Sequence, residues 1–134
     1  MTETVYHPTT PALAAQRREL APRSHQAFEE FSRAVFADGA LDRRTKQLIA
    51  VAVAHVTQCP YCIKGHTELA SREGASPHQI MESIWVAAEM RAGGAYAHST
   101  LALHALNQTL TDGRSATSPT DTPAPSATHE STRP

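Results

Sequence analysis

Apolar residues recur with a helical period along most of the chain, from about residue 10 to residue 107. Residues 24–39 place apolar side chains at spacings of one, three and four, which is the pattern of an amphipathic helix. Residues 41–58 carry a similar stripe, and this run is too long for a typical strand and rich in alanine. We therefore predict a buried helix there, although the apolar run at its centre, taken alone, would also fit a buried strand.

Capping residues predict where these helices begin. Thr10 stands before a proline, so it predicts the N-cap of a helix over residues 12–20 with Pro11 in the first turn. Asp42 is suited to cap the helix within 41–58. Cys59 and Ser76 each precede a proline as well, and a proline at the first helical position loses no intrahelical hydrogen bond.

Helix ends are predicted mainly by glycine. Asp38-Gly39 predicts a left-handed C-terminal cap for the helix over 24–39, and Gly74 predicts the end of the helix that starts after Cys59. Gly93-Gly94 is expected to interrupt the helix that follows Ser76, leaving residues 95–106 as a last helix. The buried face before this interruption is predicted to hold Ile80, Ile84, Ala87 and Ala88.

The pattern as a whole predicts an all-α fold: a bundle of about six short helices and no convincing strand. The domain is expected to span residues 10–107, after a flexible arm at 1–9. Residues 108–134 are rich in Ser, Thr and Pro and hold too few apolar side chains to offset the entropy of ordering, so we predict a disordered tail. Leftover apolar helix faces favour a homo-oligomer.

Composition removes several classes of function. The 134 residues hold 12 Lys and Arg against 13 Asp and Glu, so there is no basic excess to bind nucleic acid. Aromatic residues make up 5%, too few for a base-stacking platform. No apolar run is long enough to cross a bilayer, and no secretory signal is visible, so we expect a cytoplasmic protein without a membrane partner.

Candidate chemistry is concentrated in the run from His55 to His66, which contains Cys59 and Cys62. A helix beginning at Pro60 would place both cysteines at its N-terminus, where the helix dipole favours the thiolate. His66 follows Cys62 by four residues and so shares its helix face, within reach of a thiol proton. The spacing thus supplies a nucleophile, a base and a second thiol that can close a disulfide.

Other interpretations of this run stay open. The cysteines could be small buried hydrophobes, or His55, Cys59, Cys62 and His66 could form a zinc set, although four ligands within twelve residues differ from the usual two-knuckle arrangement. A thioredoxin-type fold is disfavoured because residues 63–107 remain helical. His55 fits a hydrogen-bonded core histidine as well as a site residue, and His98, after two glycines, could line the same site.

Residues 41–66, LDRRTKQLIAVAVAHVTQCPYCIKGH, resemble the core signature of the carboxymuconolactone decarboxylase superfamily, within its alkylhydroperoxidase D-like branch. Residues 73–99 are similar to that family too, so the resemblance covers about residues 24–106. It implies an all-helical fold assembled as trimers or hexamers, and peroxide reduction by thiols without a metal or other cofactor. Family decarboxylases generally lack the cysteine pair, which favours redox chemistry in this chain.

The resemblance also implies a role for each site residue. Cys62 would attack a hydroperoxide and become a sulfenic acid, and Cys59 would close the disulfide and accept electrons from a dithiol or lipoylated protein. His66 would assist proton transfer at Cys62. The family usually has glutamate where this chain has Gln47, and sometimes histidine where it has Tyr61. An amide can orient an imidazole but carries no proton away, so water or another carboxylate, such as Glu68 or Glu89, would complete the relay.

The sequence therefore predicts a thiol-dependent alkyl hydroperoxidase or disulfide oxidoreductase with an antioxidant role. Two alternatives come from other classes. The protein could be a non-catalytic redox sensor or interaction protein whose disulfide alters its assembly. It could also be a lyase acting on a ring lactone, for which Arg72 and Arg91 would be the candidate anion-binding groups.

Overall fold

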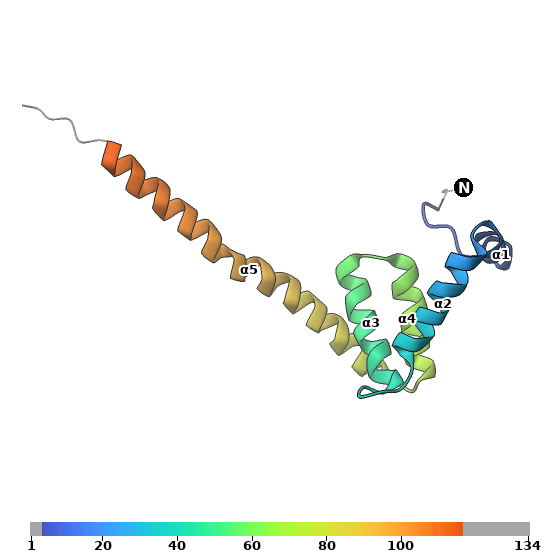
Figure 1. Ribbon diagram of the computed structural model, residues 1–134. Helices are drawn as coiled ribbons and strands as arrows, with labels where there is room; N and C mark the ends of the chain where they lie inside the picture. Colours follow the sequence, from blue (N-terminus) through green and yellow to red (C-terminus); the bar gives the residue numbers. More distant parts are fainter. Residues whose placement is uncertain (1–3, 117–134) are drawn as a thin grey trace, which may run out of the picture. The chain divides into compact units, whose positions relative to one another are not determined.

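A computed structural model of the chain describes residues 4–116 and contains five helices in that range (Figure 1). They are α1 (Pro11–Leu20), α2 (Pro22–Phe36), α3 (Arg43–Thr57), α4 (Pro60–Arg72) and α5 (Pro77–Ala116). The described residues include no strand, which confirms the all-α prediction. The chain divides into two compact units after Gly94, and α5 contributes to both.

The predicted helix starts are confirmed by their capping hydrogen bonds. Thr10 Oγ1 accepts from the backbone N–H of Leu13 at 3.2 Å, and Asp42 Oδ1 accepts from Thr45 at 2.7 Å. Ser76 forms a reciprocal capping box, because its hydroxyl accepts from the Gln79 N–H at 3.1 Å while Gln79 Oε1 accepts from the Ser76 N–H at 2.9 Å. Each bond satisfies a backbone donor that has no partner inside the helix.

One of the two predicted glycine stops is confirmed and the other is wrong. Gly74 has φ of +87° and follows Glu73, the C-cap of α4, as a glycine stop requires. Asp38-Gly39 does not cap α2, because within residues 4–116 positive φ values occur only at Gln58 and Gly74. The ammonium of Lys46 serves the end of α2 instead, donating to the carbonyls of Val35 at 2.8 Å and Ala37 at 2.6 Å.

The predicted interruption at Gly93-Gly94 is also wrong, because α5 continues without a break to Ala116. A glycine inside a helix costs only about 1 kcal/mol relative to alanine, and the flanking residues are mostly good helix formers. The last two predicted helices are therefore one, which reduces six to five. Residues 108–116 are helical rather than part of a disordered tail, and residues 117–134 lie outside the described range.

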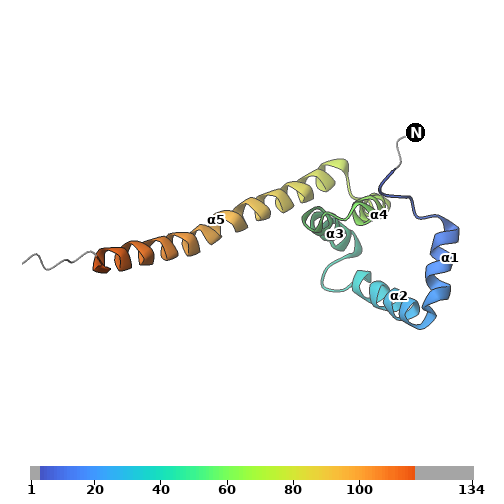
Figure 2. The same ribbon diagram turned by 90° about the horizontal axis from the view of Figure 1, so that it is seen from above.

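The core of the first unit forms where α3, α4 and the beginning of α5 meet. Val51, Ala70 and Ala75 are buried there, with Leu48, Ile80 and Ile84 packed against them. α3 and α4 lie side by side as an antiparallel hairpin, seen in both views (Figures 1 and 2). Of the predicted buried face, Ala87 is buried and the two isoleucines are half-buried, whereas Ala88 is exposed.

The helices of the first unit leave many large apolar side chains at the surface. Phe28 is 69% exposed, Phe31 63% and Trp85 67%. Trp85 therefore is not part of this chain's own core. Within the described residues, no helix combines the length and the apolar content that crossing a membrane requires.

Candidate functional site

The site begins at the tight turn between α3 and α4. Gln58 adopts a left-handed conformation with φ of 56°, which ends α3 and lets the Cys59 N–H donate back to the carbonyl of Ala54 at 3.2 Å. Cys59 is the N-cap of α4, and its Sγ accepts from the backbone N–H of Cys62 at 3.2 Å. The prediction that both cysteines lie at a helix N-terminus is confirmed.

Cys59 and Cys62 form a disulfide, with their Cα atoms 5.2 Å apart. That separation is ordinary for a bridged pair. Both side chains are half-buried, so the cysteines are neither sealed core residues nor fully exposed. In this state the sulfurs are bonded to each other, and residues 4–116 contain no group of three or more Cys, His, Asp or Glu placed to hold a metal ion.

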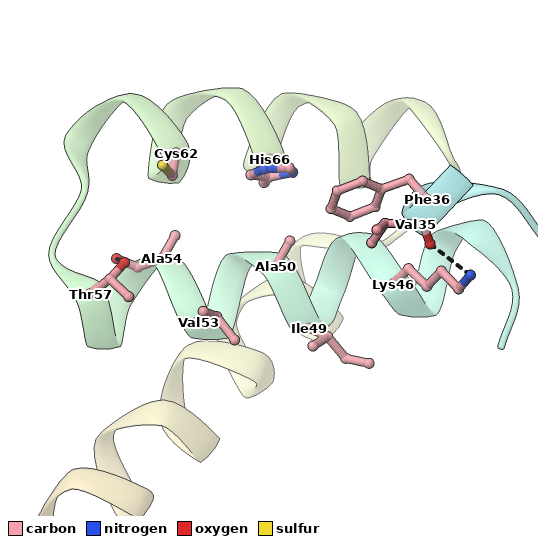
Figure 3. A pocket seen from close by; sticks show the side chains of 10 residues that line it. All are labelled: Val35, Phe36, Lys46, Ile49, Ala50, Val53, Ala54, Thr57, Cys62 and His66. Carbon is pink, nitrogen blue, oxygen red and sulfur yellow. Dashed lines mark hydrogen bonds between the residues drawn. The ribbon is translucent and has the colours of Figure 1, made fainter. Parts of the chain in front are cut away.

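A pocket of about 380 Å³ opens beside the disulfide, between α3, α4 and the end of α2. Cys62 and His66 project from α4 toward α3 and into this pocket (Figure 3). The remaining walls are mainly apolar and come from α2 and α3: Val35, Phe36, Lys46, Ile49, Ala50, Val53, Ala54 and Thr57. The pocket can therefore receive a small apolar molecule against one sulfur and one imidazole.

His66 is held on two sides. Its Nδ1 lies 2.8 Å from Oε1 of Gln47, a side chain that is only 5% exposed. An amide oxygen can only accept, so Nδ1 carries the proton of this bond and Nε2 keeps its lone pair. The ring of Phe36 stacks on the imidazole with centroids 5.2 Å apart. Burial lowers the pKa of His66 from its ordinary value of 6.5, which favours the neutral imidazole.

The other predicted site residues lie elsewhere. His55 sits on α3 outside the pocket lining, and its Nδ1 donates to the carbonyl of Val51 at 2.7 Å, as expected of a structural histidine. Tyr61 is half exposed, and its hydroxyl donates to the carbonyl of His7 at 2.8 Å. His98 belongs to the part of α5 that falls in the second unit.

None of the eight wall residues from α2 and α3 was predicted from the sequence as part of the site, Phe36 and Lys46 among them. The periodicity of α2 indicated Phe36 only as an apolar residue, and nothing in the sequence pairs Lys46 with the end of α2. The carboxylate of Glu68 pairs with Lys64 at 2.6 Å and lies outside the lining, as does Glu89. Neither glutamate therefore substitutes for the family's glutamate, whose position is occupied by Gln47 in this chain.

Comparisons with known proteins agree with this architecture. An uncharacterized protein from the cox locus of Paracoccus denitrificans is 71% identical over 82 residues, spanning 61% of this chain and 74% of that protein. A crystal structure of a carboxymuconolactone decarboxylase family protein from Legionella pneumophila superimposes with a TM-score of 0.58 at 32% identity, over 72% of this chain and 87% of that one.

A crystal structure of a protein from Methanobacterium thermoautotrophicum has a TM-score of 0.59 at 34% identity, over 62% of this chain and 93% of that one. The model of the carboxymuconolactone decarboxylase family matches residues 22–105, which include α3, α4 and the whole of the pocket lining. The chain belongs to the carboxymuconolactone decarboxylase family.

Proposed function

We propose that the protein is a thiol-dependent alkyl hydroperoxidase, a disulfide oxidoreductase that reduces organic hydroperoxides at Cys62. The observation that carries this proposal is the pairing of a Cys59–Cys62 disulfide with an apolar pocket that contains only one of the two cysteines. A redox pair divided in this way suits two successive tasks. Cys62 meets the small oxidant, and Cys59 remains available for exchange with a reductant.

In the oxidative half, both cysteines begin as thiols. The Cys62 thiolate attacks one oxygen of the hydroperoxide, the O–O bond breaks, and the leaving alkoxide takes up a proton to become an alcohol. Cys62 is then a sulfenic acid, which the thiol of Cys59 attacks, forming the disulfide and releasing water. The dipole at the N-terminus of α4 stabilises the thiolate in the first step.

His66 is the proton carrier in this scheme. Its Nε2 retains a lone pair because Nδ1 is committed to Gln47, and the lowered pKa keeps the ring neutral near pH 7. The ring shares a helix face and a pocket with Cys62, so it can take the thiol proton directly or through one water and return it to the alkoxide (Figure 3). Gln47 orients the ring and does not accept its proton.

A dithiol, carried by a small molecule or by a lipoylated protein, restores the enzyme. We further propose a homotrimer or homohexamer, which the exposed apolar surfaces of α2 and α5 support. Phe31 is 63% exposed and Val86 61%, so both are available for contact with another copy of the chain.

Single cysteine variants test the activity. We expect Cys62→Ser and Cys59→Ser each to lower hydroperoxide consumption with a dithiol donor by at least about a hundredfold. The two variants should differ in a second measurement, because only Cys59→Ser leaves a sulfenic acid at Cys62 for a trapping reagent such as dimedone. Wild-type turnover in both variants would overturn the proposal.

The same variants separate the alternatives. A disulfide that forms and alters assembly without any peroxide turnover would indicate a redox sensor. Turnover of a ring lactone that survives removal of both thiols would indicate a lyase. Arg72 and Arg91, the candidate anion-binding groups for a lyase, both lie outside the pocket, and no arginine lines it among the described residues.

A further inference from the structure

The segment that precedes α1 crosses the first turn of α4. The hydroxyl of Tyr61 donates to the backbone carbonyl of His7 at 2.8 Å, joining residues 54 positions apart. The rings of Tyr6 and Tyr61 meet edge to face, with centroids 6.2 Å apart and planes at 79°. We call residues 4–10 the N-terminal strap. It is held to α4 through Tyr61, one of the two residues that lie between the cysteines.

The strap is lightly attached. Tyr6 remains 56% exposed and Tyr61 50% exposed, although the two rings touch. Open cavities of about 460 Å³ and 440 Å³ flank Tyr61, the first between the strap and α4 and the second between the strap and α1. A contact made of one side-chain hydrogen bond and one ring edge, with cavities on both sides, can open without disturbing the core.

The bond that holds the strap would accept other occupants. It joins a side-chain hydroxyl to a backbone carbonyl, and every residue of any polypeptide carries such a carbonyl. The strap therefore covers a face of α4 that can bind an extended chain through its backbone, with little dependence on the identity of its side chains. This face is formed by Pro60, Tyr61, Lys64 and Gly65. In this structure the extended chain is the protein's own strap.

A protein that reduces the disulfide at Cys59 must also contact this face of α4, because of the area that such a contact covers. A stable protein–protein contact buries roughly 800 Å² on each partner, and even a brief one covers several hundred. Tyr61 lies in the same helical turn as the disulfide, so a contact of that size centred on Cys59 includes the tyrosine. A small dithiol needs no such area and reaches a sulfur atom alone.

We infer that the Pro60, Tyr61, Lys64 and Gly65 face is the docking surface for a protein dithiol, and that the N-terminal strap is its intramolecular competitor. This rests on the proposed redox role of the cysteine pair. One donor thiolate attacks Cys59 Sγ, the Cys59–Cys62 bond breaks, and Cys62 leaves with the electron pair and takes up a proton. The second donor thiol then attacks the mixed disulfide, so two electrons and two protons reach this chain and the donor becomes a disulfide.

Reduction of the disulfide by two donors tests the inference, with no peroxide present. The second-order rate constant is measured for dithiothreitol and for a reduced, lipoylated protein domain, and the readout is the ratio of protein to small-molecule rates. Tyr6→Ala removes the ring edge from the strap side, and Tyr61→Phe removes the hydroxyl. Tyr96→Phe, the same loss of a hydroxyl from an exposed tyrosine of α5, is the matched control.

We expect Tyr6→Ala, which alters the strap alone, to raise this ratio about three- to tenfold, the change that loss of one modest aromatic contact produces in the open population. Tyr61→Phe removes the same hydroxyl from the strap and from a docked donor, so it should leave the ratio near the wild-type value. Tyr6→Ala should leave the rate with dithiothreitol unchanged, and Tyr96→Phe should leave the ratio unchanged. A constant ratio in Tyr6→Ala would overturn the inference, and so would a falling ratio, which would mean that the strap recruits the donor. A rise in Tyr61→Phe as large as that in Tyr6→Ala would contradict the use of this hydroxyl by the donor. Loss of peroxide turnover alone would contradict the proposed function but not this result, because the assay follows only the disulfide.

Discussion

The imidazole of His66 donates from Nδ1 to Oε1 of Gln47 across 2.8 Å, so the partner of the site histidine is a neutral amide. This bond orients the ring as a carboxylate would. It differs in charge, because a neutral amide oxygen stabilises the protonated imidazole much less than a carboxylate would. Burial is then the dominant influence on the ring, and it lowers the pKa of His66. The pair favours a neutral imidazole, which can accept a proton at Nε2 but binds it weakly.

Replacing Gln47 by glutamate tests the consequence of this neutral pair. A carboxylate in contact with Nδ1 favours the protonated ring, so Gln47→Glu should raise the pKa of His66 and move the acidic limb of the pH–rate profile to higher pH. It also adds a second proton acceptor, so we expect the plateau rate of peroxide reduction to rise, by on the order of tenfold. The profile of kcat/KM against pH measures both effects.

Gln108→Glu supplies the matched control, because it adds the same charge to an exposed position of α5. Neither the plateau nor the acidic limb should move in this variant. If the acidic limb of Gln47→Glu coincided with that of the wild type, the bond between Gln47 and His66 would have no part in proton transfer.

The lowered pKa of His66 also predicts a pH dependence of stability. The unfolded chain binds a proton at this residue near the ordinary value of 6.5, whereas the folded protein binds it only at lower pH. The unfolded state therefore holds more protons as the pH falls through 6.5, and the free energy of unfolding decreases there. In His66→Asn, acidification from pH 7.5 to pH 5.5 should cost less stability than in the wild type, as measured by urea denaturation.

His78→Asn serves as the comparison, since His78 is exposed in the first turn of α5. Its loss of stability on acidification should match that of the wild type. Equal losses in all three proteins would mean that His66 titrates alike in the folded and unfolded states.

Short-range chemistry explains what could be predicted from the sequence. The caps at Thr10, Asp42, Cys59 and Ser76 act over three residues, so their signals lie entirely within the local sequence. The placement of Cys62 and His66 in one pocket likewise follows from a spacing of four residues on a single helix. These features need no knowledge of the tertiary fold.

The wrong predictions concern residues whose structure depends on distant partners or on small energies. The end of α2 depends on Lys46, eleven residues beyond the Val35 carbonyl that it binds. Gly93-Gly94 costs too little to break a helix with strong formers on both sides. The bond from Gln47 to His66 spans nineteen residues and two helices, so only the resemblance to a family indicated that position.

Lys46 predicts a measurable contribution to stability. Its ammonium binds two carbonyls at the end of α2 from a half-buried position, and hydrogen bonds to a charged donor are among the stronger ones. Lys46→Met should therefore lower the free energy of unfolding by about 1–2 kcal/mol. Lys64→Met is a matched control, because Lys64 is exposed and its ion pair is with Glu68 on the same helix, an interaction worth roughly 0.5 kcal/mol or less. Equal losses in the two variants would contradict this role for Lys46.

The second unit makes its own prediction about assembly. Between Ala95 and Ala116, α5 carries an exposed stripe at helical spacings of seven, three and four, formed by Tyr96, Leu103, Leu106 and Leu110. An isolated helix of this length is marginal in water, so pairing of this stripe with another copy of the chain would stabilise it. Burying one leucine contributes about 1.5–3 kcal/mol, so Leu103→Gln should weaken the proposed oligomer at least about tenfold, seen by light scattering across a dilution series. Leu101→Gln makes the same change at a residue that is 65% exposed but lies off the stripe, and it should leave the mass unchanged. A wild-type protein that is monomeric at micromolar concentration would contradict this assignment, because the stripe would then be exposed without a partner.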